Sequence, residues 1–217
     1  MKNRKNIITV AIDSPAAAGA GSQAKLIAKH YKLFYLDTGK IYRYIGKLRL
    51  DNNKKFSYNL VEKKINSIKL SYLNNKSLLT DDVAISASKV AKDKKIRSIV
   101  FKYQKQYAYS PPKKFKGSVL DGRDITSVIM KNAMFKFFIT ANVKTRALRR
   151  FKELNAKNKR ISFQEVLKSI KKRDKSDMNR KISPLKKTKD SILIINSNLS
   201  IRSCFFKIKK IMDKKIN

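Results

Sequence analysis

The chain is poor in cysteine, in acidic residues and in long apolar runs. Its 217 residues include one cysteine, Cys204, which excludes an intramolecular disulfide and fits a reducing compartment. Asp and Glu number 15 against 53 Lys and Arg, which gives a formal net charge of +38. The apolar run at Ile7 to Ile12 ends at Asp13 and is too short for a signal peptide. No later segment approaches the length of a membrane span, so we expect a cytoplasmic protein without a membrane partner.

The positive charge admits nucleic acid, an anionic membrane or an anionic small substrate as a partner. However, the lysines are spread along nearly the whole chain together with many Asn and Ile residues, which indicates compositional drift more than a dedicated binding face. No internal repeat, aromatic-interleaved basic motif or recognised nucleic-acid module is visible. A hydrophobic content of 42% is typical of a globular protein, here long enough for one sizeable core and a smaller additional lobe.

The first part of the chain has the pattern of a strand, a small-residue loop and a helix. Ile7 to Ile12 is a β-branched run typical of a strand buried on both faces. Ser14 to Gly21 is the loop, and Ser22 to Tyr31 is predicted to be a helix. Backbone N–H groups in such a loop, together with the helix N-terminus, bind phosphate. The spacing departs from G-x-x-x-x-G-K-[ST], because Ser14 replaces the first glycine and Ala20 replaces the lysine.

Strands and helices alternate through the remaining chain. Short apolar runs predict strands at 33–36, 117–120, 135–140 and 192–195. The expected helices are 41–50, 58–68, two within 82–108, one after 140, 163–172 and 201–213, with a small hairpin at 69–80 and a mobile-looking Lys/Asn-rich stretch at 152–162. This alternation predicts a three-layer α/β fold around a parallel sheet. Ligands bind at the carboxyl ends of such strands, where we expect Asp13, Asp37 and Asp121.

Five short motifs follow one another along the chain. They are Ile12-Asp13-Ser14-Pro15; Asp37-Thr38-Gly39 with Tyr42-Arg43; Ser88-Lys89-Val90-Ala91 with Ile96-Arg97; Asp121-Gly122-Arg123-Asp124; and an Arg-Asp-x-x-Asp-x-x-Arg box at 173–180, followed by Ser183-Pro184-Leu185 and Asp190. In these motifs, their order and their approximate spacing, the whole chain resembles the bacterial cytidylate kinases, a family of P-loop nucleoside-monophosphate kinases. The family has glycine where this chain has Ser14.

The resemblance implies a P-loop fold in three parts. The core would comprise about 1–50, 113–150 and 176–217, with a monophosphate-binding lobe at about 51–112 and a short lid at about 151–175. It implies transfer of the ATP γ-phosphoryl group to CMP or dCMP, with Mg²⁺ accompanying ATP and a monomeric enzyme. No residue is predicted to be a direct metal ligand.

The resemblance also implies a role for each motif residue. ATP would be bound by Ser14, Pro15, Ala16, Ala17, Ala18, Gly19, Ala20, Gly21, Ser22, Arg149 and Arg150. The monophosphate substrate would be bound by Asp13, Thr38, Gly39, Tyr42, Arg43, Ser88, Arg97, Asp121, Arg123, Asp124, Asp177 and Arg180. The residues expected at the reacting phosphates are Arg123, Arg180, Asp121, Arg149 and Arg173. Within these sets, Arg43, Arg123 and Arg180 would hold the monophosphate, and Asp13 and Asp121 would orient arginines or magnesium waters.

Simpler interpretations exist for single motifs. Arg146, Arg149 and Arg150 fit a solvated helix face, and Arg173 with Asp177 fits a surface ion pair at i,i+4. Their occurrence together favours the kinase. An adenylate- or UMP-type kinase is disfavoured by the Asp-Gly-Arg-Asp box, Ser88 and Asp177.

The missing lysine leaves alternatives open. Backbone N–H groups could suffice, with Lys25, Lys40 or a lid arginine as the replacing cation. The chain could instead be an impaired or repurposed kinase, or a kinase-like fold that binds nucleic acid through its charge, and such binding would weaken steeply with salt.

Overall fold

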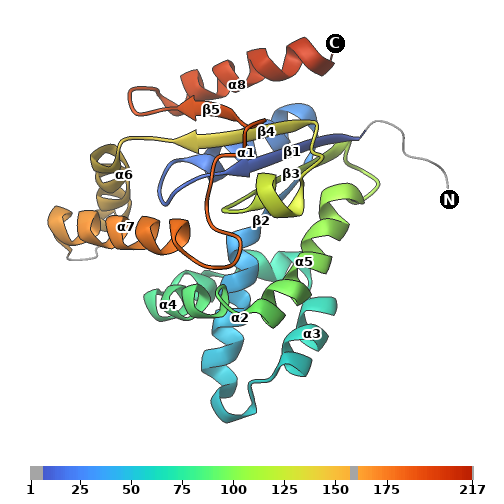
Figure 1. Ribbon diagram of the computed structural model, residues 1–217, viewed down its shortest axis with the longest axis vertical. Coiled ribbons are helices and arrows are strands. Elements are labelled where there is room, and N and C mark those ends of the chain that lie inside the picture. The colour runs from blue at the N-terminus through green and yellow to red at the C-terminus, as the bar shows by residue number, and fades with distance from the viewer. Residues whose placement is uncertain (1–6, 157–160, 217) are drawn as a thin grey trace.

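Five parallel strands form one sheet in the computed structural model, which describes residues 7–156 and 161–216. The strands are β1 (Ile8–Asp13), β2 (Phe34–Asp37), β3 (Gly117–Gly122), β4 (Phe135–Thr140) and β5 (Ile192–Ile195), and their order is β2-β3-β1-β4-β5. Every pairing among them is parallel. Parallel neighbours require crossover connections, and these are helical here, which confirms the predicted fold class (Figure 1).

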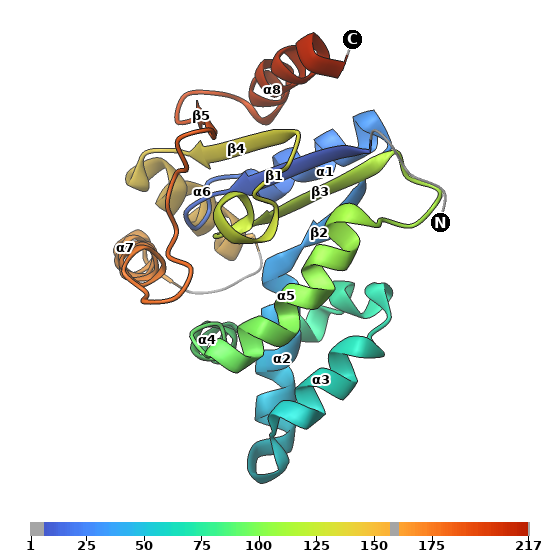
Figure 2. The same cartoon turned by 45° about the vertical axis from the view of Figure 1, so that its right-hand side comes forward.

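Helices cover both faces of the sheet. They are α1 (Ala20–Tyr31), α2 (Thr38–Asn52), α3 (Tyr58–Asn66), α4 (Asp81–Val90), α5 (Lys94–Tyr109), α6 (Val143–Asn155), α7 (Phe163–Met178) and α8 (Ile201–Ile216). The connections include the 3₁₀ turns η1 (Asn53–Lys55), η2 (Leu70–Asn74) and η3 (Lys76–Leu79) and a π-helical turn, η4 (Ile125–Ile129). Helices α2 to α5 project from the sheet as one lobe, whereas α8 lies over its opposite face (Figures 1 and 2).

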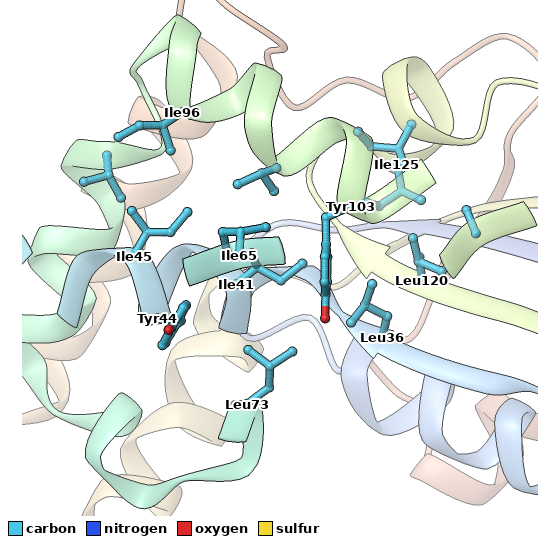
Figure 3. Packing of buried hydrophobic residues seen from close by; sticks show 14 of the residues in the cluster. Leu36, Ile41, Tyr44, Ile45, Ile65, Leu73, Ile96, Tyr103, Leu120 and Ile125 are labelled. Atoms are coloured by element: carbon cyan, nitrogen blue, oxygen red, sulfur yellow. The ribbon is translucent and has the colours of Figure 1, made fainter. Parts of the chain in front are cut away.

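The sheet separates two hydrophobic cores. Along β1, Val10 and Ile12 point into the core shared with α1 and α8, and Ala11 points into the core shared with α2 and α5. This alternation follows the two-residue period of a strand, and both faces are buried, as the apolar run predicts. The second core continues from Leu36 and Leu120 into the lobe, where Ile41 and Ile45 of α2 lie at its centre (Figure 3).

The hairpin predicted at 69–80 is wrong. Two 3₁₀ turns, η2 and η3, take its place and bury Leu73 and Leu78 in the core of the lobe. Asn75 separates them, and its side chain accepts a hydrogen bond from the Ser77 N–H at 2.9 Å. Local Asn-to-backbone bonding of this kind competes with a strand ladder, and the burial of the two leucines decides between them.

Two further boundaries differ from the predictions. Helix α7 continues past Lys172 to Met178, so that much of the Arg-Asp-x-x-Asp-x-x-Arg box is helical. Helix α2 begins at Thr38 and therefore directly at the carboxyl end of β2. In the stretch 152–162, residues 157–160 lie outside the described part of the chain.

Candidate functional site

The small-residue loop lies between β1 and α1. Its backbone turns through Ala17, with a φ of 58°, and Gly19, with a φ of 85°. Both values are in the left-handed region that glycine adopts freely and alanine at some cost. Gly19 precedes the first residue of α1, Ala20, which is 4% exposed. The first N–H groups of α1 have no partner within the helix, so this end of the loop can accept an anion.

A pocket opens at the carboxyl ends of β2 and β3, below α7 and beside α2, α4 and α5. Its lining residues are Asp37, Thr38, Gly39, Tyr42, Arg43, Ala84, Ala87, Ser88, Ala91, Lys92, Arg97, Asp121, Gly122, Arg123, Asp124, Arg173, Ser176, Asp177 and Arg180. All predicted substrate-binding residues except Asp13 line it, and so does Arg173. Residues of four of the five motifs therefore come together in one pocket, although they are up to about 140 positions apart along the chain.

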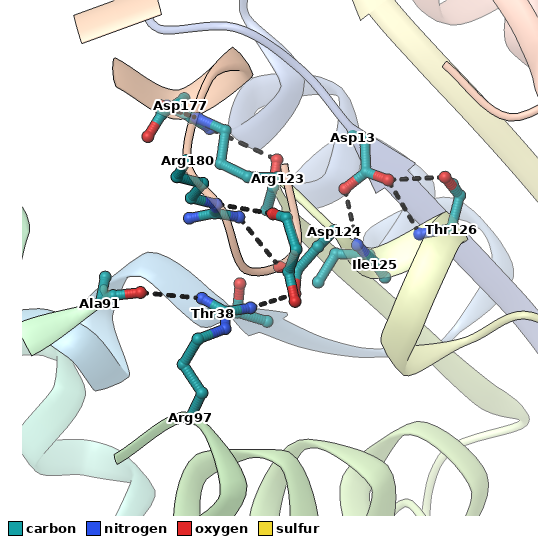
Figure 4. A network of polar contacts seen from close by, with 12 residues as sticks. Asp13, Thr38, Ala91, Arg97, Arg123, Asp124, Ile125, Thr126, Asp177 and Arg180 are labelled. Atoms are coloured by element: carbon teal, nitrogen blue, oxygen red, sulfur yellow. Dashed lines mark hydrogen bonds and ion pairs between the residues drawn. The ribbon is translucent and has the colours of Figure 1, made fainter. Parts of the chain in front are cut away.

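Asp124 joins two arginines on one side of this pocket (Figure 4). It forms a short, buried ion pair with Arg97, whose guanidinium also donates to the Ala91 carbonyl at 3.1 Å. Nη2 of Arg180 lies 3.8 Å from the other carboxylate oxygen of Asp124. Arg180 is held by its Nε, which donates to the Ser183 carbonyl at 2.6 Å. Among the described residues, the buried Nη2 of Arg180 has no hydrogen-bond partner, so it can donate to a ligand.

More arginines than carboxylates line the opposite side. Arg123 donates to Asp177 at 2.8 Å, and Nε of Arg173 lies 4.0 Å from the same carboxylate oxygen. Arg43 donates to the Leu78 carbonyl at 2.9 Å. Partial burial and then the neighbouring charge of Arg123 lower the pKa of Arg173, and burial also lowers the pKa of Arg43. Because these arginines carry like charges and have few carboxylate partners, this side of the pocket favours a bound anion.

Asp121 has an unsatisfied carboxyl oxygen at the end of β3. Its Oδ1 is buried and has no hydrogen-bond partner among the described residues. Burial and then the nearby Asp37 carboxylate raise the pKa of Asp121 to about 7. The Asp121 carbonyl accepts from the Thr38 hydroxyl at 2.8 Å. A Cβ at Gly122 would lie 2.5 Å from that hydroxyl, which explains why glycine follows Asp121.

Asp13 is fully buried and does not line the pocket. Its carboxylate accepts from the N–H of Ile125 at 2.7 Å and from the N–H and hydroxyl of Thr126 at 2.9 and 2.6 Å (Figure 4). It thereby fixes the turn that follows Asp124. Burial raises the pKa of Asp13 to about 6, although these hydrogen bonds favour the ionised form.

Three of the candidate replacements for the lysine are bonded to other residues, and the fourth is exposed. Arg149 donates to Oδ1 and to the carbonyl of Asn196, at 3.0 and 2.8 Å. Arg150 pairs with Glu153 at 2.9 Å on α6. Nζ of Lys40 donates to the Asn74 side chain at 2.7 Å, and Lys25 is exposed on α1.

Comparison with known proteins identifies the family. The family model for cytidylate kinase matches residues 10–214. The chain belongs to the cytidylate kinase family. A cytidylate kinase from Clostridium botulinum (strain Langeland) is 39% identical over 218 residues, covering 95% of this chain and 98% of that protein. One from Thermosipho melanesiensis is 39% identical over 216 residues, covering 95% and 97%.

Two solved structures share the fold at low sequence identity. An uncharacterized protein from Eubacterium ventriosum has a TM-score of 0.57 and 17% identity, covering 95% of this chain and 98% of that chain. A sugar kinase from Janibacter sp. HTCC2649 has a TM-score of 0.50 and 10% identity, covering 96% and 95%.

The predicted membership of the cytidylate kinase family is confirmed by the family model and the curated relatives.

Sequence reasoning did not select several residues at the site. Lys92 and Ser176 line the pocket without belonging to any motif position that the family pattern specifies. Asn196 donates to the carbonyl of Ala18 in the loop at 2.9 Å. Arg146 and Asp174 also contact the loop. Asp174 belongs to the box at 173–180, whereas Arg146 is considered only as part of a solvated helix face; for Arg146 that interpretation is wrong, because the side chain is buried against the loop and α7.

Proposed function

We propose that this chain transfers the γ-phosphoryl group of ATP to CMP or dCMP, giving ADP and CDP or dCDP. Membership of the cytidylate kinase family supports this reaction. The observation that carries it is the set of arginines around one pocket, with Nη2 of Arg180 and Oδ1 of Asp121 buried and without hydrogen-bond partners among the described residues. A monophosphate nucleotide offers both the anion and the hydrogen-bonding base edge that such groups require.

Positioning and positive charge account for most of the rate in phosphoryl transfer. In our proposal, Arg43, Arg123 and Arg180 hold the acceptor phosphate, and Arg173 lies beside it. The base and sugar are positioned by Thr38, Gly39, Tyr42, Ser88, Arg97, Asp124 and Asp177. A wrong base would leave buried polar groups unpaired, which gives strong discrimination. Asp13 acts through the turn at Ile125 and Thr126, to which it is bonded, and not by contact with substrate.

The ATP phosphates occupy the loop in this proposal. Residues from Ser14 to Ser22 surround them with backbone N–H groups, and Arg149 and Arg150 approach from α6. Mg²⁺ accompanies ATP and keeps most of its contacts to phosphate and water. Asp121, whose buried Oδ1 has no hydrogen-bond partner among the described residues, would orient water molecules bound to this ion.

The three parts expected from the family also belong to the proposal. The acceptor lobe comprises residues of about 51–112 packed around α2, which links them to the sheet, the lid comprises about 151–175, and the core comprises the remainder. Closing the lid over ATP would exclude water and limit hydrolysis.

The described residues contain no helix that is long and apolar enough to cross a bilayer. We expect a monomer that works in the cytoplasm, where its nucleotide substrates are.

The test compares wild type with Ala20→Lys. ADP release would be measured with Mg-ATP and CMP, dCMP, UMP or AMP in turn. We expect CMP- and dCMP-dependent turnover by wild type, which would show that the loop works without a lysine. Turnover only in Ala20→Lys would identify a kinase disabled at one residue. Inactivity of both proteins would refute the proposal and direct attention to salt-dependent RNA binding.

A further inference from the structure

One ion pair holds both polar backbone groups of a single loop residue. The Ala16 N–H donates to Oδ1 of Asp174 at 3.3 Å, and the Ala16 carbonyl accepts from Nη1 of Arg146 at 2.9 Å. Nη2 of Arg146 and Oδ2 of Asp174 are 2.7 Å apart, which closes the ring. Arg146 is 5% exposed and Asp174 8%. Three segments distant in sequence, namely the loop, α6 and α7, therefore meet at Ala16.

The guanidinium of Arg146 is fully engaged in this arrangement. Its Nε donates to the Ala141 carbonyl at 2.9 Å, in addition to the contacts with Ala16 and Asp174. Buried ion pairs cost desolvation energy, and well-packed apolar residues often replace them without loss of stability. Stability alone therefore does not account for a charged pair at this position. What an apolar pair could not do is bond to the backbone of Ala16.

The contacts of Ala16 adjoin a residue with a strained backbone, Ala17. Ala17 has a φ of 58°, a conformation that is unfavourable for alanine and persists where surrounding contacts determine it. The Ala17 methyl packs against the apolar cluster between α6 and α7 that includes Ala147 and Ile170. On its other side, the Ala18 carbonyl accepts from Asn196 at 2.9 Å. The turn is thus held before, at and after its strained residue.

We propose that Arg146 and Asp174 are positioning residues that set the conformation of the phosphate-binding loop. The inference rests on the proposed function, in which this loop holds ATP. Asp174 lies nearly one helical turn before Asp177 on α7, so the same helix presents Asp177 to the pocket and Asp174 to the loop. In a loop without its lysine, correct placement of the backbone N–H groups provides the main contact with the phosphates.

The alternative is a purely structural role, in which the pair only joins α6 to α7. Three variants distinguish the two roles: Arg146→Met, Asp174→Leu and the double variant. Each single variant leaves one buried charge unpaired and is expected to lose stability. The double variant removes both charges and is expected to regain much of that stability. Because neither residue can then bond to Ala16, the positioning role predicts that the loop stays impaired.

The measurements are the KM for ATP, the KM for CMP, kcat and the thermal unfolding midpoint. We expect kcat/KM for ATP to fall about 10- to 100-fold in the double variant, while the KM for CMP stays near that of wild type. Lys136→Met is the matched control, since it breaks the ion pair with Asp190 away from the loop. This control should leave both KM values unchanged.

Two results would overturn the inference. One is a double variant that regains the wild-type kcat/KM for ATP along with its stability, and the other is an equal increase in both KM values. If wild type shows no CMP-dependent turnover, the proposed function has failed on its own. The inference is then decided by calorimetric titration with Mg-ATP. Weaker ATP binding by the double variant than by wild type supports it. Equal binding by both proteins, or binding by neither, refutes it.

Discussion

Replacing Asp13 with asparagine should change how the stability of the protein depends on pH. The carboxylate is completely buried and accepts three hydrogen bonds from Ile125 and Thr126. Burial nevertheless outweighs these bonds and raises the pKa of Asp13 from 3.8 to about 6. The folded protein thus binds this proton more tightly than the unfolded chain does.

The direction in which stability changes with pH follows from proton linkage. The stabilisation by protonated Asp13 is fully present below pH 3.8 and is lost as the pH rises through about 6. The difference between the two pKa values corresponds to about 3 kcal/mol. The amide side chain of the Asp13→Asn variant does not titrate, so the stability of the variant lacks this contribution. The free energy of unfolding of wild type minus that of Asp13→Asn should therefore fall by about 3 kcal/mol between about pH 3 and pH 7.

Urea unfolding of both proteins across this pH range would measure the difference, provided that the m-values agree. Asp213→Asn is the matched control. The Asp213 carboxylate is bonded to Lys209 and Tyr31, which lower its pKa, so its contribution has the opposite pH dependence. The reasoning would be refuted by either of two results. The free energy of unfolding of wild type minus that of Asp13→Asn could stay constant with pH, or it could grow as the pH rises.

Three further changes have expected outcomes. Asp124→Ala leaves Arg97 buried without its partner, and we expect a loss of about 3–5 kcal/mol in urea unfolding together with weaker CMP binding in calorimetric titration. Gly46→Ala places a Cβ 2.6 Å from the Ala87 nitrogen where α2 crosses α4, so thermal unfolding should show a loss of about 1–3 kcal/mol, whereas Lys47→Ala, on the outer side of α2, should change little. Ala20→Lys adds a cation next to Gly21, where a Cβ would lie 3.5 Å from the Asp121 carboxylate, and NMR titration should show a lower pKa for the Asp121 carboxyl in the variant than in wild type; an unchanged or higher pKa would contradict this.

Much of the fold could be predicted from the sequence, because most of its signals are local. The β-branched and aromatic runs at Phe135–Thr140 and Ile192–Ile195 coincide with β4 and β5. Errors arose where tertiary contacts decide. The hairpin at 69–80 was wrong because burial of Leu73 and Leu78 in the lobe selects 3₁₀ turns, and no local pattern reports that burial.

The pocket could be predicted because its residues belong to motifs at the carboxyl ends of strands. The contacts of Asp13 and Ala16 could not. Asp13 bonds mainly to backbone N–H groups, which every residue except proline offers, so its partners leave no pattern in the sequence. Ala16 is likewise held through its backbone, by Arg146 and Asp174, which are 130 and 158 positions away.

In our proposal, the charge balance around the loop allows ATP to bind with an alanine at position 20. Asp121 lies beside Gly21, where a Cβ would be 3.5 Å from its carboxylate, and burial raises its pKa to about 7. Near neutral pH, Asp121 is therefore partly uncharged. Alanine at position 20 supplies no positive charge, and protonating Asp121 removes one negative charge from the same end of the sheet. Mg²⁺ arriving with ATP favours the ionised carboxylate again. In our proposal, a partly protonated Asp121 repels the ATP phosphates less than a full carboxylate would, which offsets part of the positive charge that a lysine would supply.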